Sequence, residues 1–335
     1  MFDLVNLILK RQTFMEIKEI KITDIENIKI GNAQDLEGAT GLTVVLCPKG
    51  APTGLAVFGG GPASREGTLT DPLSSTKAIH GVVIGGGSAF GLDAAGGVQR
   101  YLEERDIGYD VGVTKVPLIC QSDLFDLTVG DYKARPDQEM AYEACVNAEK
   151  NQPEEGNFGA GTGASIGKVK GMDYAMKSGL GMYALQVGEL KVGAIVAVNA
   201  LGDVFDPESG ERLAGMLNEE KNSLGNCEMA LYETYTKEAN LFVGNTTLGV
   251  VVTNGKLDKT QMNKIAKMAH NGYAKTINPV NTTADGDSVY AMSVGELETN
   301  MDMVGTLAAR VMAQAIKRAI TQAKGAYGLK GYEDL

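Results

Sequence analysis

The stretch LFVGNTTLGVVVTNG, residues 241–255, decides how the rest of the chain is interpreted. Its second half, TTLGVVVTN (246–254), is apolar and rich in β-branched residues, which predicts a buried strand. The two threonines that begin this strand follow Asn245 directly. Threonine is favoured in strands, so this segment alone indicates two ordinary structural residues. The alternative is that the hydroxyl of Thr246 is a nucleophile.

A nucleophilic hydroxyl needs a base, and a threonine at a chain's N-terminus carries one. Its α-amine has an unperturbed pKa of ~7.7–8.0, so the amine accepts a proton near neutral pH. Thr246 becomes N-terminal if its hydroxyl attacks the Asn245 carbonyl to form an ester and water then hydrolyses that ester. Gly244 permits a strained turn at the point of cleavage. A histidine base is disfavoured, because His80 and His270 lie within a strand-like run and a helical pattern, where structural histidines are common.

The composition predicts a globular protein that binds small molecules. The 335 residues are 44% hydrophobic, and 31 basic against 42 acidic residues give a net charge of −11. Without a basic cluster the chain is a poor partner for nucleic acid, and no segment is long and apolar enough to span a membrane. The cysteines are far apart and form no CxxC pair, which argues against a zinc site and disulfides and favours a cytoplasmic location. They are Cys47, Cys120, Cys145 and Cys227.

The chain begins with MFDLVNLILKRQTF, whose charges follow its apolar run, unlike a signal peptide. Met15 is an alternative start. We expect residues 1–27 to form an N-terminal extension and first segment, and residues 28–335 to form a single domain.

Strand-like and helix-like patterns do not alternate strictly along the chain, which favours an α+β layered body over a doubly wound parallel sheet. Helices are predicted over 88–104, with Ser88 as N-cap, over a segment after 257 that opens with a capping box from Asp258 to Gln261, and over 300–323. The polar gap at 132–157 is interpreted as an excursion or internal boundary. The predicted strands are LTVVLC (42–47), HGVVIG (80–85), MYALQVG (182–188), VGAIVAVN (192–199), TTLGVVVTN (246–254) and SVYAMSV (288–294).

Three glycine-rich or acidic motifs fail their usual functional patterns. GGGSAFG (85–91) has Phe90 where a dinucleotide loop or a nucleophile elbow needs glycine, and GTGASIGKV (161–169) ends in Val169 where a Walker loop needs serine or threonine. DGD (285–287) lacks the further acids of a calcium loop, so by spacing alone it is a solvated turn. These motifs predict neither a cofactor nor a metal site.

Seven segments together resemble the DmpA-type family, the L-aminopeptidase/D-esterase group of self-processing N-terminal nucleophile hydrolases. This group includes β-peptidyl aminopeptidases and nylon-oligomer hydrolases. The resemblance covers roughly residues 28–323, in the family's order. The segments are IKIGNAQDLEGATGLTVVL (28–46), GGGPASREGTLTDP (59–72), HGVVIGGGSAFGLDAAGGVQRYLEE (80–104), GAGTGASIGKVKGM (159–172), VGAIVAVNALGDVFDP (192–207), GNTTLGVVVTN (244–254) and NTTADGDSVYAMSVGE (281–296).

The resemblance implies an αββα layered sandwich, like that of the ornithine acetyltransferases, and cleavage between Asn245 and Thr246 into an α chain, 1–245, and a β chain, 246–335. Thr246 would then be the nucleophile. Asn199 matches an asparagine of the oxyanion hole, where a neutral donor meets developing negative charge. Lys168 matches a lysine of the nylon-hydrolase branch, where a cation lowers the pKa of the new amine.

The remaining predicted site residues also come from the resemblance. Asp285 and Asp287 match the pair that orients the amine, although many aminopeptidases of the family have Ser-Gly-Glu there. Phe125 replaces a tyrosine that commonly lines the site, and it is expected to contact substrate together with Gly86 and Gly87.

The resemblance favours aminopeptidase activity on short peptides or amino-acid amides, with linear 6-aminohexanoate oligomers as the second choice. Acyl transfer, as in ornithine acetyltransferases, and a non-cleaving binding protein of the same fold are the remaining alternatives. Small peptide or oligoamide substrates are the expected partners. Homo-oligomers, commonly tetramers, are also expected from the family.

Overall fold

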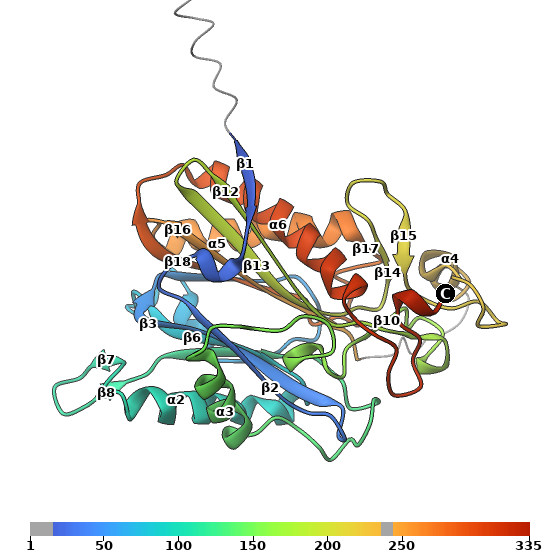
Figure 1. Ribbon diagram of the computed structural model, residues 1–335, viewed down its shortest axis with the longest axis horizontal. Coiled ribbons are helices and arrows are strands. Elements are labelled where there is room, and N and C mark those ends of the chain that lie inside the picture. Colours follow the sequence, from blue (N-terminus) through green and yellow to red (C-terminus); the bar gives the residue numbers. More distant parts are fainter. Residues whose placement is uncertain (1–15, 236–243) are drawn as a thin grey trace, which may run out of the picture.

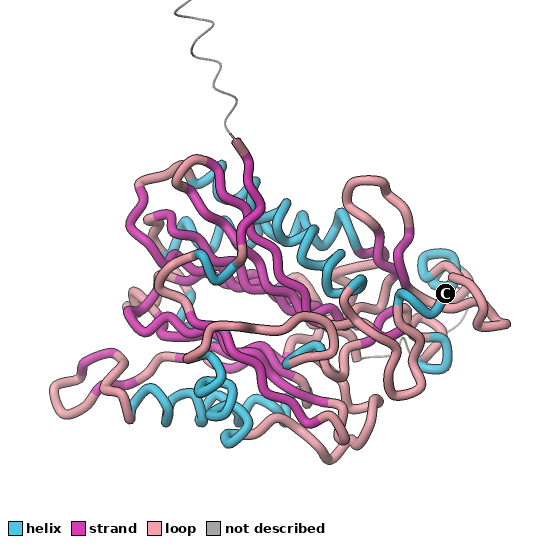
Figure 2. The backbone as a smooth tube through the Cα atoms, viewed as in Figure 1, coloured by secondary structure: helices cyan, strands magenta, loops and turns pink. Residues whose placement is uncertain are grey.

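Two stacked β-sheets, each covered by helices on its outer side, form the centre of the molecule in this computed structural model (Figure 1). The structure describes residues 16–235 and 244–335. Met15 and the first part of the predicted extension therefore lie outside the described residues. The order of layers is helix, sheet, sheet, helix, as predicted, and Figure 2 shows the strands as two central layers.

The first sheet has six strands in the order β1-β12-β13-β16-β18-β4. Neighbouring strands are antiparallel, except that β16 and β18 run parallel. The strands β12 and β13, which match two of the predicted strands, pair as a hairpin, and β16 is the strand that begins at Thr246. The strands are β1 (Ile17–Ile20), β4 (Thr53–Val57), β12 (Leu180–Val187), β13 (Leu190–Asn199), β16 (Thr246–Gly255) and β18 (Ser288–Leu297).

The second sheet has five strands in the order β2-β3-β6-β9-β5. The pair β6 and β9 is parallel, so both strands end at the same edge of the sheet. The strands are β2 (Lys29–Asp35), β3 (Thr40–Ala51), β5 (Ala63–Arg65), β6 (Ile79–Gly85) and β9 (Ile119–Asp123). Shorter strands complete the fold: β7 (Tyr109–Asp110), β8 (Lys115–Val116), β10 (Ser165–Ile166), β11 (Met176–Lys177), β14 (Asp203–Phe205), β15 (Arg212–Ala214) and β17 (Ile277–Asn278).

Helices α5 (Lys259–Thr276) and α6 (Met301–Thr321) cover the six-stranded sheet, and α2 (Ala95–Glu103) and α3 (Gln138–Ala148) cover the five-stranded sheet (Figure 1). The short helix α4 (Cys227–Tyr232) lies near one end of the molecule. The predicted capping box of α5 is present, because Asp258 accepts from the Gln261 backbone and Gln261 accepts from Asp258. Since this box satisfies N–H groups of the first turn, it fixes where the helix begins.

Alternation along the strands builds three cores. In β16, Leu248 and Val250 belong to the core between the two sheets, whereas Val251 packs toward α5 and α6. The third core fills the space between the five-stranded sheet and α2 and α3. Because side chains alternate between the faces of a strand, Thr246 shares the inter-sheet face with Leu248.

One local prediction is wrong, and one of two alternatives left open for another segment is excluded. Ser88 does not cap a helix, since residues 88–94 form a 3₁₀ segment that makes no side-chain cap, and the α-helix begins at Ala95. Gly87 and Ser88 have φ values of 80° and 53°, which a regular helix start does not allow. The gap at 132–157 is no internal boundary, because α3 within it packs on β2 and β3.

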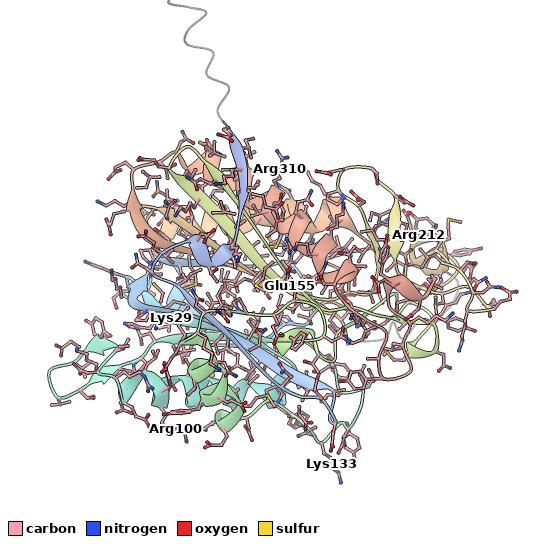
Figure 3. All side chains as sticks on the ribbon, in the orientation of Figure 1. Lys29, Arg100, Lys133, Glu155, Arg212 and Arg310 are labelled. Atoms are coloured by element: carbon pink, nitrogen blue, oxygen red, sulfur yellow. The ribbon has the colours of Figure 1, made fainter. Side chains whose placement is uncertain are left out.

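The segment before residue 28 also joins the sandwich. β1 pairs with β12, and Ile22 and Ile25 are buried between the sheets. Farther along, Glu155, labelled in Figure 3, accepts hydrogen bonds from Arg318 of α6 and from the backbone of Met182. Within the described residues, no helix has both the length and the apolar character that crossing a bilayer requires.

Candidate active site

The site lies where β13 ends and β16 begins. Asn199, the last residue of β13, is the register partner of Thr246, the first residue of β16. Both face the space between the sheets, and both are buried, with Thr246 only 4% exposed. The side chain of Asn199 also reaches the second sheet, since its Nδ2 donates to the carbonyl of Phe125, just beyond β9. The two sheets are therefore joined at this point.

The peptide carbonyl of Asn245, which precedes Thr246, accepts hydrogen bonds from two groups within the described part of the chain. Thr246 Oγ1 donates to it at 2.5 Å, and the backbone N–H of Gly286 donates at 2.8 Å. The second bond belongs to an isolated β-bridge between Asn245 and Asp285. The predicted nucleophile and the predicted scissile bond are therefore held against the loop that precedes β18.

Lys168 is fully buried beside Asn199. Its Nζ donates to Asn199 Oδ1 at 2.8 Å, to the Asn199 carbonyl at 3.1 Å and to the Gly244 carbonyl at 3.1 Å. Asn199 Nδ2 donates to the same Gly244 carbonyl at 3.2 Å. The backbone N–H of Ser165 fixes the orientation of the Asn199 amide by donating to Oδ1 at 3.1 Å. Two side chains thus converge on the carbonyl one residue before the predicted cleavage site.

The carboxylates of Asp285 and Asp287 are buried and point to different partners. Asp287 accepts from the backbone N–H of Thr247 at 2.7 Å and from that of Asn281 at 2.9 Å. Asp285 accepts from the hydroxyl and the backbone N–H of Thr282. Asp287 therefore contacts the backbone immediately after Thr246, while Asp285 stabilises its own loop. DGD is a buried, ordered turn and not a solvated one.

Burial and charge shift the pKa values of this cluster in opposite directions. Burial lowers the pKa of Lys168 to about 7, and this shift is opposed by the nearby carboxylates of Asp285, Asp126 and Asp287. Burial, followed by the charge of Asp285, raises the pKa of Asp287 to about 7. Both shifts favour the neutral form of a buried group, and perturbed pKa values of this kind are common at functional sites.

The predicted substrate-binding residues lie at the adjoining edge of the five-stranded sheet. Gly86 and Gly87 follow β6, but their N–H groups are already used: Gly86 donates to the Gly41 carbonyl and Gly87 to Asp126. A Cβ on Gly86 would lie 1.9 Å from Asp126 Oδ2, so the glycine is needed for this close approach. Phe125 is half-buried and contributes its backbone carbonyl to Asn199.

The structure adds four residues that sequence reasoning missed: Gly286, Ser165, Thr282 and Asp126. Gly286 and Ser165 act through backbone N–H groups, which leave no mark in side-chain chemistry. Asp126, buried against Gly87 and Thr40, follows Phe125 in the segment LFDL (124–127), where an acid among apolar residues was a signal that could have found it. The two histidines are buried core residues: His270 stacks on Phe58, and burial lowers its pKa to about 4.

Among the described residues, no group of three or more His, Cys, Asp or Glu side chains is arranged to hold a metal ion. The site is instead a buried hydroxyl with amide, ammonium and carboxylate groups around it. A layered α+β sandwich with such a hydroxyl at the start of a central strand is the arrangement that the resemblance to N-terminal nucleophile hydrolases predicts.

Comparison with known proteins identifies the family. The model of peptidase family S58 matches residues 21–333, and the chain belongs to that family. An uncharacterized aminopeptidase of Mycobacterium tuberculosis is 34% identical, over 94% of this chain and 97% of the relative. A 6-aminohexanoate-oligomer endohydrolase of Agromyces is 27% identical, over 90% and 86%. The resemblance to the DmpA-type family is therefore confirmed, and the chain is a hydrolase of the aminopeptidase and amidase type.

Solved structures confirm the fold. The L-aminopeptidase D-Ala-esterase/amidase of Ochrobactrum anthropi, described as a variant of the Ntn hydrolase fold, aligns with a TM-score of 0.67 at 17% identity. The alignment covers 91% of this chain and 86% of that one. The predicted α+β sandwich is thus correct.

Proposed function

We propose that the chain cleaves itself between Asn245 and Thr246 and then uses N-terminal Thr246 to hydrolyse short peptides or amino-acid amides. The observation that carries this proposal is the buried contact between Thr246 Oγ1 and the Asn245 carbonyl, with Lys168 and Asn199 one residue away. An ordinary strand start has no reason to gather a buried lysine and two buried carboxylates.

The first reaction is an acyl shift followed by hydrolysis. The Oγ1 of Thr246 attacks the Asn245 carbonyl carbon, the C–N bond breaks, and the hydroxyl proton ends on the Thr246 nitrogen. Water then cleaves the ester and restores the hydroxyl. Because β16 lies between β13 and β18, the resulting α chain (1–245) and β chain (246–335) remain joined through the sheet.

In the second reaction the new α-amine of Thr246 accepts the hydroxyl proton while Oγ1 attacks the substrate carbonyl. Asn199 Nδ2 and Lys168 Nζ are the donors for the resulting oxyanion. Asp287 orients the backbone next to the nucleophile through Thr247. The leaving amine departs with a proton, and water resolves the acyl-enzyme.

Mass spectrometry of the freshly purified protein tests the proposal. The expected result is a fragment that begins at Thr246, and the Thr246→Ala chain should stay whole. An intact wild-type chain would favour the non-cleaving binding protein of the same fold. Cleavage that persists in Thr246→Ala would assign the cut to another residue.

Hydrolysis of linear 6-aminohexanoate oligomers is the second candidate. It is supported by Lys168 and by the Asp285-Gly286-Asp287 turn, which match the nylon-hydrolase pattern, and by the 27% identity to the Agromyces enzyme. A panel of aminoacyl amides, β-dipeptides and aminohexanoate oligomers separates the candidates. If kcat/KM is highest for the oligomers, the aminopeptidase assignment is wrong.

We further propose a homo-oligomer that works in the cytoplasm. All four cysteines are free and buried, which suits a reducing compartment. Light scattering of the purified protein tests the oligomer, and a monomeric mass would refute it.

A further inference from the structure

The carbonyl of Asn245 has a hydrogen-bond donor that differs from the donors of the neighbouring carbonyl. The backbone N–H of Gly286 donates to it at 2.8 Å. Asn199 Nδ2 and Lys168 Nζ donate instead to the Gly244 carbonyl, one residue earlier, at 3.2 and 3.1 Å. The atom that becomes negatively charged when Thr246 attacks its own peptide bond is thus paired with Gly286.

Gly286 is buried, and the space around it excludes a side chain. A Cβ on this residue would lie 2.6 Å from Thr246 Oγ1 and 2.9 Å from the Gly61 carbonyl, both closer than real Cβ contacts. The absence of a side chain lets the backbone N–H approach the scissile peptide while the hydroxyl keeps its place. The same glycine therefore serves both the nucleophile and the carbonyl.

The loop that carries this N–H is held from several sides, so the donor is in place before any reaction. Gly61 N–H donates to the Asp285 carbonyl at 2.8 Å, and Asp285 accepts from Thr282. Asp287 on the other side accepts from Thr247 N–H. Preorganised donors of this kind stabilise a developing charge without reorganisation during the reaction.

We infer that the Gly286 N–H is the oxyanion donor of the self-cleavage step, whereas Asn199 and Lys168 serve the substrate reaction. This inference rests on the proposed cleavage between Asn245 and Thr246. As Oγ1 adds to the carbonyl carbon, the C=O electron pair moves to oxygen, and the Gly286 N–H donates to that oxygen. The C–N bond then breaks and the Thr246 nitrogen receives the hydroxyl proton. The two reactions thus use separate donors around one nucleophile.

The test replaces Gly286 by glycolic acid during cell-free synthesis of the full chain, which exchanges the N–H for an ester oxygen without adding bulk. The ester also weakens the Asp285 carbonyl as an acceptor for Gly61. The matched control is therefore glycolic acid in place of Gly61, which removes that second hydrogen bond and leaves the Gly286 N–H intact. The appearance of the fragment that begins at Thr246 is followed by mass spectrometry.

We expect the ester at 286 to slow cleavage by ~10²–10³-fold, the cost of losing one oxyanion donor. The chain with the ester at 61 should cleave itself at a rate within about threefold of the wild-type rate. The thermal stability of each ester-containing chain should differ from that of the wild type by no more than the loss of one hydrogen bond. Equal slowing by both esters, or wild-type cleavage by the ester at 286, would overturn the inference. If the wild-type chain itself stays intact, the proposed function fails and this inference fails with it.

Discussion

The substitution Gly286→Ala tests the position of the nucleophile without removing any hydrogen-bonding group. The new Cβ would lie 2.6 Å from Thr246 Oγ1, whereas ordinary contacts begin at 3.4 Å, so one of the two atoms must move by about 0.8 Å. The same Cβ would also lie 2.9 Å from the Gly61 carbonyl oxygen and 3.2 Å from Pro62 Cα, so a shift of the loop must relieve these contacts as well. A misplacement of ~1 Å costs about 10²-fold in rate. We therefore expect self-cleavage to slow by roughly that factor.

The assay is a time course of cell-free synthesis, in which the fragment beginning at Thr246 is measured against the intact chain. The control is Gly61→Ala in the adjoining segment, since its Cβ would meet nothing closer than the Asp285 carbonyl at 3.9 Å. That variant should cleave at the wild-type rate. Thermal unfolding of both proteins shows whether the alanine at 286 also disturbs the fold.

Cleavage of Gly286→Ala at the wild-type rate, in a protein that unfolds like the wild type, would refute the reasoning. It would mean that the reacting hydroxyl does not occupy the position seen here. Together with the ester at 286, this variant separates two effects: alanine moves the hydroxyl and keeps the N–H, whereas the ester keeps the space and removes the N–H.

Three further predictions concern charge and capping. Asp126→Asn removes a negative charge that raises the pKa of Lys168. The limb of the pH–rate profile that Lys168 governs should therefore move to lower pH. A limb that does not move would exclude Lys168 as the group that governs it. Burial lowers the pKa values of Lys168 and Lys177 to about 7, so between pH 7 and 10.5 the unfolded chain binds more protons at these two lysines than the folded chain does. The contribution of the two lysines to stability should therefore rise with pH in this window, and urea unfolding of Lys177→Met should show the loss of one lysine's share. Asp258→Ala should lower the free energy of unfolding by about 1 kcal/mol by removing the cap of α5, and Asp258→Ser should lose much less.

The secondary structure was predictable where periodicity is strong. The β-branched run that begins at Thr246 forms β16, and the apolar runs on either side of residues 189–190 pair as β12 and β13. The start of α5 was predictable because the Asp258 capping box is a local signal. The 88–104 helix was wrong at its start, because Gly87 and Ser88 take positive φ values that residue preferences do not indicate.

The candidate site was less predictable from residue chemistry, since it depends on pairings between distant segments. Thr246 and Asn199 are strand-register partners although they are 47 positions apart, and β18 pairs in parallel with β16 after a helical crossover. Local patterns do not encode such pairings, and the site residues were predicted from the family resemblance instead. Gly286 stayed unnoticed within a quoted motif because its contribution is a backbone N–H and the absence of a side chain.

If the chain cuts itself as proposed, the arrangement of donors couples activation to cleavage. In the intact chain, Lys168 Nζ and Asn199 Nδ2 both donate to the Gly244 carbonyl, so the segment before Thr246 occupies the donors that the proposed substrate reaction needs. Cutting the bond after Asn245 removes the covalent tether that keeps this carbonyl there, while β16 stays held between its neighbours. A chain that cannot cut itself should therefore lack both the amine base and a free oxyanion hole. An added external base would replace the missing amine but would not free the oxyanion hole. The uncut chain should therefore still not hydrolyse substrate.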